Sequence, residues 1–297
     1  MKVFVTGVNG QLGHDVMAEL AKRGYEGIGS DIQESGEYEK YYSLDITNQE
    51  KVREVLLKVN PNVVVHCAAW TAVDAAEDDD KRDLVYRINA DGTRNIAEAA
   101  KEIDAKMVYI STDYVFNGKG KTPWQPDCKD YEPLSVYGDS KLKGELAVSG
   151  LLNKYYIVRI AWVFGVNGNN FINTMIRVGS NHDTVRVVND QIGTPTYTKD
   201  LAVLLVDMIE TDKYGYYHAT NEGGYISWYD FTKEIYKQMN MKTEVIPVTT
   251  AEYGLSKAAR PFNSRLDKSK LVENGFTPLP AWQDALARYL KEKGFVK

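Results

Sequence analysis

A glycine-rich turn near the start of the chain constrains the fold more than any other feature. The apolar run 2–5 leads into Thr6-Gly7-Val8-Asn9-Gly10-Gln11-Leu12-Gly13, and a stretch with helical spacing follows at once. A strand, a turn with three glycines and a helix, in this order, are typical of a dinucleotide-binding βα unit. The G-x-x-G-x-x-G spacing is one residue longer in its first gap than G-x-G-x-x-G, but the physical requirements are the same.

Each glycine has its own role in such a turn. Gly7 permits the tight bend, Gly10 lets backbone N–H groups approach a pyrophosphate, and Gly13 allows the helix to pack closely on the strand. The N-terminus of the helix adds unpaired N–H donors and a partial positive charge. We therefore expect this turn to bind a dinucleotide rather than to serve only as a turn.

An acidic residue closes the second expected strand. Asp31 follows Gly13 by 18 residues, close to the ~20-residue offset of a carboxylate that binds the ribose 2′-hydroxyl. The alternative is that Asp31 only opens a turn. A carboxylate here favours NADH and disfavours the extra phosphate of NADPH, although a neighbour such as Gln33 could still donate to that phosphate. The expected cofactor is therefore NADH or NADPH.

Short apolar runs alternate with amphipathic stretches through the first half of the chain. This alternation predicts right-handed crossovers and a parallel sheet with helices on both faces. The run 63–65 is apolar throughout, as expected for a strand covered on both sides. The expected strands are 2–5, 25–30, 40–43, 62–67, 106–111 and 155–160, and the expected helices are 11–23, 48–59, 81–103 and 137–149.

The rhythm changes after about Trp162. Glycine and asparagine crowd residues 165–170, and the later strands (185–188, 216–219 and 244–248) are scattered among helices. We therefore expect an α/β fold, with a Rossmann-type, doubly wound parallel sheet over residues 1–161. A smaller C-terminal α/β substrate-binding lobe is expected over residues 162–297, with segments around 184–222 returning to the first domain.

Charge and cysteine content narrow the set of partners and compartments. The formal net charge is −5 and the sequence pI about 5.5, so nucleic acid is not an expected partner. No apolar stretch approaches the ~18 residues that span a bilayer, and no charged-then-apolar signal segment opens the sequence. Cys67 and Cys128 are isolated, which indicates a reducing compartment. These features predict a cytoplasmic protein without a membrane partner.

Tyr137 and Lys141 are spaced as i and i+4, which places them on one face of an expected helix. A free tyrosine has a pKa near ~10 and donates a proton poorly at neutral pH, but a neighbouring ammonium group lowers that pKa. Lys141 could also reach a cofactor ribose. The chain has 20 tyrosines, so such a pair is expected by chance. Its place after the fifth expected strand is what favours a catalytic role.

That fifth strand ends in Ile110-Ser111-Thr112-Asp113-Tyr114. The carboxyl ends of parallel strands line the ligand crevice of an open α/β sheet. A hydroxyl group of Ser111 or Thr112 could therefore bind a substrate carbonyl and hold it against the Tyr137 phenol. The alternative for either hydroxyl is to cap the loop.

Four motifs resemble those of the extended short-chain dehydrogenase/reductase family: Gly7-x-x-Gly10-x-x-Gly13, Asn89-Ala-Asp-Gly-Thr93, Ser111-Thr-Asp-Tyr-Val-Phe116 and Tyr137-x-x-x-Lys141. Within that family the chain is similar to the dTDP-4-dehydrorhamnose reductases. The similarity lies in residues 69–74, 111–116, 133–138, 159–165, 168–171, 189–196 and 260–264, which span nearly the whole chain.

The resemblance implies NAD(P)H-dependent reduction of the 4-keto group of dTDP-4-dehydro-L-rhamnose to dTDP-L-rhamnose, in the synthesis of deoxysugar precursors of polysaccharides. It implies that Thr112 polarises the keto group, that Tyr137 donates the proton, and that Lys141 tunes Tyr137 and holds the ribose. The implied cofactor contacts are Gly7, Gly10, Gln11, Leu12, Gly13, Asp31, Ile32, Asp45, Ile46, Cys67, Ala68, Ala69, Tyr137 and Lys141. The implied substrate contacts are Thr71, Val73, Thr112, Trp162, Asn170, Arg177 and Gln191.

Other roles stay open. Asn89 is expected to be structural, with its amide bracing the helix against a neighbouring strand. The resemblance is compatible with a homodimer and with a bound Mg²⁺ ion, but no acidic residues match a metal site, and the four histidines are too scattered to form one. The alternative functions are another nucleotide-sugar 4-keto reductase or epimerase, or a non-catalytic regulatory subunit related to that of methionine adenosyltransferase.

Overall fold

The computed structural model describes residues 1–34 and 37–296. Its centre is a seven-stranded sheet with the order β11-β6-β5-β4-β1-β2-β3, in which every neighbouring pair is parallel. The strands are β1 (Lys2–Thr6), β2 (Glu26–Asp31), β3 (Tyr41–Ser43), β4 (Val63–His66), β5 (Lys106–Thr112), β6 (Tyr155–Ile160) and β11 (Gly215–His218). The expected Rossmann-type parallel sheet is confirmed.

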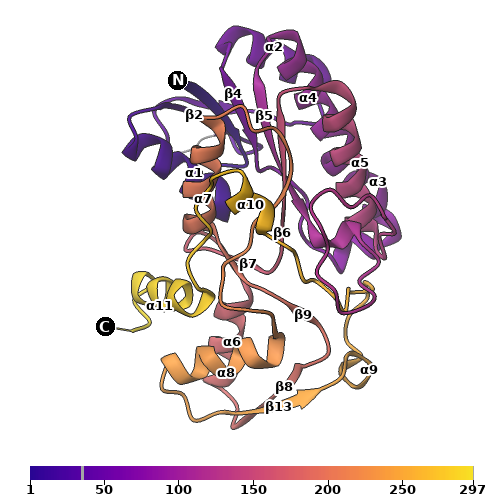
Figure 1. Ribbon diagram of the computed structural model, residues 1–297, viewed down its shortest axis with the longest axis vertical. Coiled ribbons are helices and arrows are strands. Elements are labelled where there is room, and N and C mark those ends of the chain that lie inside the picture. Colours follow the sequence, from indigo (N-terminus) through magenta and orange to yellow (C-terminus); the bar gives the residue numbers. More distant parts are fainter. Residues whose placement is uncertain (35–36, 297) are drawn as a thin grey trace.

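Helices cover both faces of this sheet (Figure 1). Val3 and Val5 are buried in a core shared with α1 (Gln11–Lys22) and α7 (Thr198–Ile209). Phe4, between them, packs on the opposite face in a second core, because successive side chains of a strand point to opposite sides. That face is covered by α2 (Gln49–Val59), α4 (Thr93–Glu102) and α5 (Val136–Leu151). The sheet is therefore doubly wound.

The stretch expected as one helix over 81–103 is divided in three. It consists of α3 (Asp79–Tyr86), a π-helical segment (Arg87–Gly92) and α4. Asn89, in the π-helical segment, accepts from the backbone N–H of Trp70 at 2.8 Å and donates to the Trp70 carbonyl at 3.1 Å and the Ser140 hydroxyl at 3.0 Å. Its amide therefore braces the helix against the loop after β4 and against α5, not against a strand.

The second half of the chain builds a smaller body below the sheet (Figure 1). Its core lies between α6 (Phe171–Gly179), α8 (Trp228–Gln238) and α11 (Trp282–Glu292). There β8 (Thr184–Val188) pairs with β13 (Glu244–Val248). Four further strands have two residues each: β7 (Val163–Phe164), β9 (Ile192–Gly193), β10 (Thr196–Tyr197) and β12 (Ile226–Ser227). The short helices are α9 (Thr250–Tyr253) and α10 (Ser269–Glu273).

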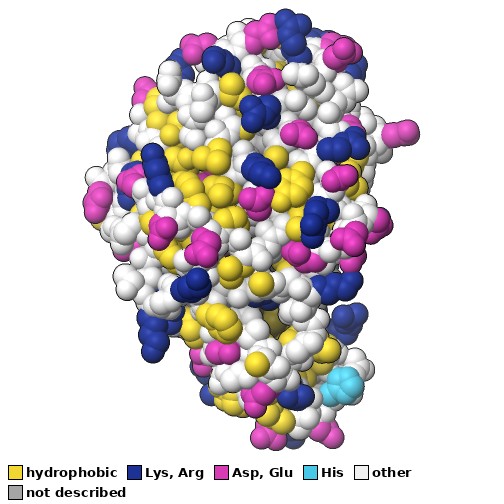
Figure 2. Space-filling view, turned by 90° about the vertical axis from the view of Figure 1, so that its right-hand side faces the viewer, with side chains coloured by type: hydrophobic (Ala, Val, Ile, Leu, Met, Phe, Trp, Pro, Cys, Tyr) yellow, Lys and Arg dark blue, Asp and Glu magenta, His cyan; other side chains and the backbone are white. Residues whose placement is uncertain are grey.

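The chain crosses between the two bodies more than once. After β6 it enters the lower body, and it then returns through α7 to β11, which pairs with β6 at the edge of the sheet. We propose on this arrangement that the boundary between two domains lies near residue 161. In the described part of the chain, no helix has the length and apolar character needed to cross a membrane. Figure 2 shows Lys and Arg interspersed with Asp and Glu over one face.

Candidate active site

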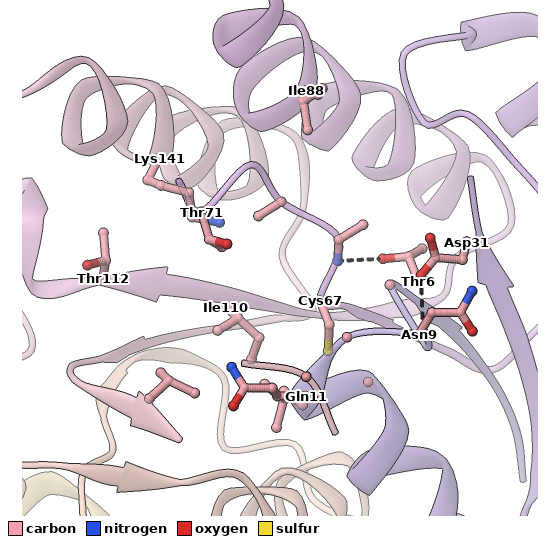
Figure 3. A pocket seen from close by; sticks show the side chains of 18 of the residues that line it. Thr6, Asn9, Gln11, Asp31, Cys67, Thr71, Ile88, Ile110, Thr112 and Lys141 are labelled. Carbon is pink, nitrogen blue, oxygen red and sulfur yellow. Dashed lines mark hydrogen bonds between the residues drawn. The ribbon is translucent and has the colours of Figure 1, made fainter. Parts of the chain in front are cut away.

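One elongated cavity of about 850 Å³ runs along the carboxyl ends of the central strands. It crosses the point between β1 and β4 where the strand order reverses, which is where open α/β sheets bind their ligands. In Figure 3, Asp31 and Asn9 lie at one end of the cavity and Thr112 at the other, with Lys141 and Thr71 between them. The cavity can therefore hold an extended ligand whose two ends meet different chemistry.

The glycine turn forms the floor of this cavity. Gly7 has a φ of +71°, and a Cβ atom on it would lie 2.7 Å from the backbone nitrogen of Ala68. A Cβ atom on Gly13 would lie 2.2 Å from the carbonyl oxygen of Gly7. Gly10 precedes α1, and no side chain of the described residues caps that helix. Its first N–H groups are thus available to phosphate oxygens, so the residues present fit a dinucleotide.

Asp31 is held in place at the end of β2. One carboxylate oxygen accepts from the backbone N–H of Asn9 at 3.0 Å, and the other accepts from the N–H of Ile32 at 2.8 Å. Gln33 is also held, because its side-chain oxygen accepts from the side chain of Asn9 at 3.1 Å. The carboxylate of Asp31 is therefore fixed beside the glycine turn, where a ribose would lie.

The loop after β4 forms one wall of the cavity. The side-chain oxygen of Thr6 accepts from the Ala68 N–H at 3.2 Å and bonds the His66 ring at 2.7 Å. Burial lowers the pKa of His66 to about 3 and raises the pKa of the Cys67 thiol to about 12. Both side chains are therefore uncharged near neutral pH, and Cys67 serves as an unreactive part of the wall.

Helix α5 brings Tyr137 and Lys141 to the cavity. Ser135 caps the helix by accepting from the Gly138 N–H at 3.1 Å, and Glu77 accepts from the Val136 N–H at 2.8 Å. Tyr137 thus lies in the first turn of the helix, and Lys141 lies one turn further along. Glu77 therefore helps to hold the start of the helix that carries the two side chains.

Burial controls the charges of both side chains. It raises the pKa of Tyr137, and the Asp113 carboxyl raises it further, whereas a hydrogen bond with Thr112 lowers it. Burial also lowers the pKa of Lys141 to about 7, opposed by the charge of Glu145. Burial is the larger effect on each group, so the net pKa of Tyr137 lies above its ordinary value and not below it as expected from the sequence. The Lys141 ammonium lies 4.2 Å from the centre of the Tyr109 ring.

The hydroxyl groups of Ser111 and Thr112, at the end of β5, both line the cavity but differ in their hydrogen bonds. The Thr112 hydroxyl donates to Asp113 at 3.0 Å and accepts from the Tyr114 N–H at 3.2 Å. The Ser111 hydroxyl is buried and has no hydrogen-bond partner among the described residues. The rings of Tyr114 and Tyr137 meet edge to face, 5.5 Å between centres. Thr112 is the hydroxyl that the structure brings together with Tyr137.

Three of the expected substrate contacts form the wall beyond Thr112, namely Thr71, Val73 and Trp162. Trp162 has a φ of +51°, which is unusual for a bulky residue. Its ring stacks on Trp228 with 3.8 Å between centres and 17° between planes. Trp228 also lines the cavity, so two stacked indole rings close this end.

The other three expected substrate contacts are not among the residues that line the cavity. The side chain of Asn170 caps α6, accepting from the N–H groups of residues 172 and 173, and also donates to the Gly165 carbonyl. Arg177 is exposed on α6. Gln191 is buried and donates to the Thr250 hydroxyl at 3.0 Å. The structure thus places these side chains in structural or surface positions.

The expected cofactor residues all line the cavity, and so do others that sequence reasoning missed. Several of these residues lie next to expected residues in the sequence, and that adjacency could have identified them. Asn167, from the glycine- and asparagine-rich stretch, donates to the Asn9 carbonyl at 3.0 Å and so ties the lower body to the glycine turn. The missed residues are Thr6, Asn9, Ser30, Leu44, Thr47, Leu84, Arg87, Ile88, Ile110, Asp113, Tyr114, Ile160, Ala161, Val163, Asn167, Gly168, Asn169 and Trp228.

A metal site is not evident in residues 1–34 and 37–296. No three His, Cys, Asp or Glu side chains come together there in a way that could hold an ion.

Comparison with known proteins gives full-length matches. The RmlD substrate binding domain family matches residues 1–294. The spore coat polysaccharide biosynthesis protein SpsK of Bacillus subtilis is 38% identical and covers 98% of both chains. The dTDP-4-dehydrorhamnose reductase of Aggregatibacter actinomycetemcomitans is also 38% identical, covering 96% of this chain and 97% of its own. The crystal structure of dTDP-4-dehydrorhamnose reductase from Bacillus anthracis in complex with NADP superposes with a TM-score of 0.90. It is 44% identical and covers 98% of this chain and 100% of its own.

Proposed function

This chain belongs to the RmlD substrate binding domain family, and on that premise we propose that it reduces dTDP-4-dehydro-L-rhamnose to dTDP-L-rhamnose with NADH or NADPH. The resemblance expected from the sequence is confirmed by relatives named dTDP-4-dehydrorhamnose reductase. A net reduction is favoured over an epimerase or a regulatory subunit.

One observation carries this proposal. A single cavity joins a dinucleotide-binding turn to a buried tyrosine, threonine and lysine. Gly10 and Asp31 at one end fit the pyrophosphate and the ribose, whereas Thr112, Tyr137 and Lys141 at the other end fit a carbonyl group. A regulatory subunit would have no use for this second set of buried polar groups, each of which is costly to bury.

The chain's own residues divide the work of carbonyl reduction. The reduced nicotinamide, when bound, supplies the hydride. Thr112 binds the keto oxygen and withdraws electron density from its carbon. Tyr137 then gives its phenolic proton to the same oxygen, as a general acid. The raised pKa keeps Tyr137 protonated at neutral pH, so the proton is in place before the reaction begins.

Lys141 acts on both the cofactor and the acid. Its pKa of about 7 leaves it partly charged near neutral pH, and its position one turn from Tyr137 allows it to hold a ribose hydroxyl. Its positive charge favours the tyrosinate that remains after proton transfer. Because both groups are buried, water does not screen this interaction.

The cofactor assignment includes both nicotinamide dinucleotides. The fixed carboxylate of Asp31 favours a free ribose 2′-hydroxyl and hence NADH. The 44%-identical relative was solved with NADP, so the phosphorylated form belongs in any test. We expect higher kcat/KM with NADH and measurable turnover with NADPH.

The nucleotide sugar is proposed to enter from the Trp162 end of the cavity. Stacked indole rings present a flat apolar surface, which suits the carbon face of a 6-deoxysugar or a thymine ring. We also propose a cytoplasmic location and a homodimer. Size-exclusion chromatography with light scattering measures the oligomeric state.

An activity panel tests the proposal. Purified protein is mixed with NADH or NADPH and with dTDP-, UDP- or GDP-linked 4-keto sugars, and loss of the reduced nicotinamide is followed by absorbance. We expect turnover with dTDP-4-dehydro-L-rhamnose. In Tyr137→Phe we expect kcat to fall by about 10²-fold or more, with cofactor binding retained. Tightly bound NAD with no net oxidation would instead indicate an epimerase, and full activity in Tyr137→Phe would contradict the mechanism.

A further inference from the structure

The residue after Thr112 has an unusual position for a carboxylic acid. Asp113 lines the active-site cavity and is only 1% exposed. One of its oxygens accepts from the Thr112 hydroxyl at 3.0 Å. The other is buried and has no hydrogen-bond partner among the described residues. Asp113 also forms no ion pair with any Lys, Arg or His of the described residues.

The direction of the Thr112 hydroxyl hydrogen depends on the partners of that hydroxyl group. A threonine hydroxyl has one hydrogen to donate and two lone pairs that accept. In the arrangement described, Oγ1 of Thr112 accepts from the Tyr114 N–H and gives its one hydrogen to Asp113. Oγ1 then has one lone pair left, which can accept from the Tyr137 phenol but cannot donate to the substrate. A lone pair repels a keto oxygen, so an ionised Asp113 leaves Thr112 unable to polarise the substrate.

A proton on Asp113 reverses this arrangement. The carboxylic acid then donates to Oγ1 of Thr112, which still accepts from the Tyr114 N–H, and the hydrogen of Thr112 is free. The heavy-atom positions need not change, because each donor and acceptor distance serves in either direction. The burial of the carboxyl group, with no cation beside it, favours this neutral form.

The surroundings of Asp113 favour its protonated form below about pH 6. Burial raises its pKa to about 6, while the hydroxyls of Ser264 and Thr112 lower it. Asp113 faces Tyr137 on α5 and Tyr114 on its own loop. Both phenols are neutral near pH 6, because their pKa values are raised above the ordinary value of 10.0. The guanidinium group in this region, on Arg260, pairs with Asp74 at 2.6 Å and also donates to the hydroxyls of Ser256 and Tyr114.

We propose that Asp113 is a positioning residue for the reduction: its protonated carboxyl group donates to Thr112 and thereby turns the Thr112 hydroxyl hydrogen toward the keto oxygen of the substrate. This inference rests on the proposed function. Asp113 keeps its proton throughout the reaction, since the proton delivered to the substrate oxygen is that of Tyr137.

Two variants separate this role from a structural one. Asp113→Asn keeps the shape and supplies a permanent N–H donor to Thr112, whereas Asp113→Ala supplies none. We measure kcat and kcat/KM with NADH and dTDP-4-dehydro-L-rhamnose from about pH 5 to pH 8, with Asp284→Asn on α11 as a control for loss of charge. Melting temperature and NADH binding are recorded for each protein to check the fold.

The wild-type enzyme should lose kcat/KM as the pH rises through the pKa values of Asp113, about 6, and Lys141, about 7. Loss of two required protons gives a limiting slope of −2 in a plot of log kcat/KM against pH. Asp113→Asn should keep most of the activity and reduce the slope to −1. Asp113→Ala should lower kcat by about tenfold or more. An Asn variant that loses as much as the Ala variant, or keeps the slope of −2, would overturn the proposal.

Infrared difference spectroscopy gives a second readout that does not depend on turnover. The carbonyl band of a protonated carboxyl group should appear in wild type below about pH 6 and be absent from Asp113→Asn. If that band appears while no 4-keto sugar is turned over, the proposed function fails and the protonation of Asp113 stands. If the enzyme is active and the band is missing across this range, the role of Asp113 is wrong.

Discussion

At the scale of single residues, the site uses groups that are costly to bury. Lys141 is 3% exposed, and burial lowers its pKa from the ordinary value of 10.5 to about 7. A buried lysine with a lowered pKa destabilises the folded state at every pH at which the unfolded chain would hold the proton. The protein therefore retains Lys141 at the expense of stability, which is expected of a catalytic group.

Replacing Lys141 should separate stability from activity. In Lys141→Met we expect a higher free energy of unfolding than in wild type, together with loss of reductase activity. The gain should be largest at and below pH 7 and vanish as the pH approaches 10.5, because the unfolded chain then no longer binds the extra proton. Urea unfolding at a series of pH values measures this.

Lys143→Met is the matched control, because Lys143 lies on the same helix with its side chain 54% exposed. It should change stability little at any pH. A Lys141→Met protein that is less stable than wild type at pH 7 would show that the lysine stabilises the fold instead.

Residue types and spacing predict the glycine turn, Asp31, Tyr137 and Lys141, and the family resemblance supplies the other expected cofactor contacts. Every expected cofactor residue lines the cavity, because strand ends and glycine turns have fixed geometry in a parallel sheet. The direction of the pKa shift on Tyr137 could not be predicted this way, since it depends on burial. The stacking of Trp228 on Trp162 could not be predicted either, because it joins two segments that are far apart in the sequence.

At the scale of elements, a buried ion pair holds α5 to the sheet. Arg159 on β6 and Glu145 on α5 are both fully buried, and two nitrogens of the guanidinium donate to the carboxylate at 2.8 and 2.7 Å. The same arginine lies against the rings of Phe116 and Tyr216. Because α5 carries Tyr137 and Lys141, this pair fixes the helix that presents the acid.

Breaking the pair should be strongly destabilising. Arg159→Met leaves an unpaired buried carboxylate, which typically costs about 3–5 kcal/mol. Arg53→Met removes an exposed pair with Glu102 and should cost no more than about 1 kcal/mol. Chemical denaturation of the two variants makes the comparison, and equal losses would mean that the buried pair has no special role.

The glycine turn gives a second prediction for an element. A Cβ atom at position 13 would lie 2.2 Å from the Gly7 carbonyl oxygen, whereas one at Gly150 meets nothing within 4 Å. Gly13→Ala should therefore displace α1 from the turn, cost about 1–3 kcal/mol and weaken NADH binding. Gly150→Ala should leave NADH binding unchanged. Calorimetric titration with NADH measures both, and unchanged binding in Gly13→Ala would contradict the assigned turn.

Most elements of the sheet could be predicted, but one helix boundary could not. The apolar runs and their alternation with amphipathic stretches predict the strands near their observed bounds. The π-helical segment around Asn89 has no periodic signal, because it forms to let this side chain bond the loop after β4 and α5. The two-residue strands of the lower body were missed because so short a pairing has no pattern of its own.

At the scale of the whole molecule, the cavity depends on contacts between distant segments. Asp74, near the loop after β4, accepts from the backbone N–H groups of Lys257 and Ala258 at 3.1 Å and pairs with Arg260. Asn167 similarly ties the lower body to the glycine turn. The sheet supplies the cofactor groups and the lower body supplies Trp228, so a substrate can be held against both.

The central claim is that this cavity transfers a hydride to C4 of a dTDP-linked keto sugar, with the proton from Tyr137. The most direct measurement uses NADH deuterated at the transferring position of nicotinamide C4, together with dTDP-4-dehydro-L-rhamnose, and analyses the sugar nucleotide by NMR and mass spectrometry. We predict dTDP-L-rhamnose with deuterium at C4, formed in step with NADH oxidation and nearly abolished in Tyr137→Phe. A product without deuterium at C4, or recovery of unreacted sugar with NADH intact, would contradict the account.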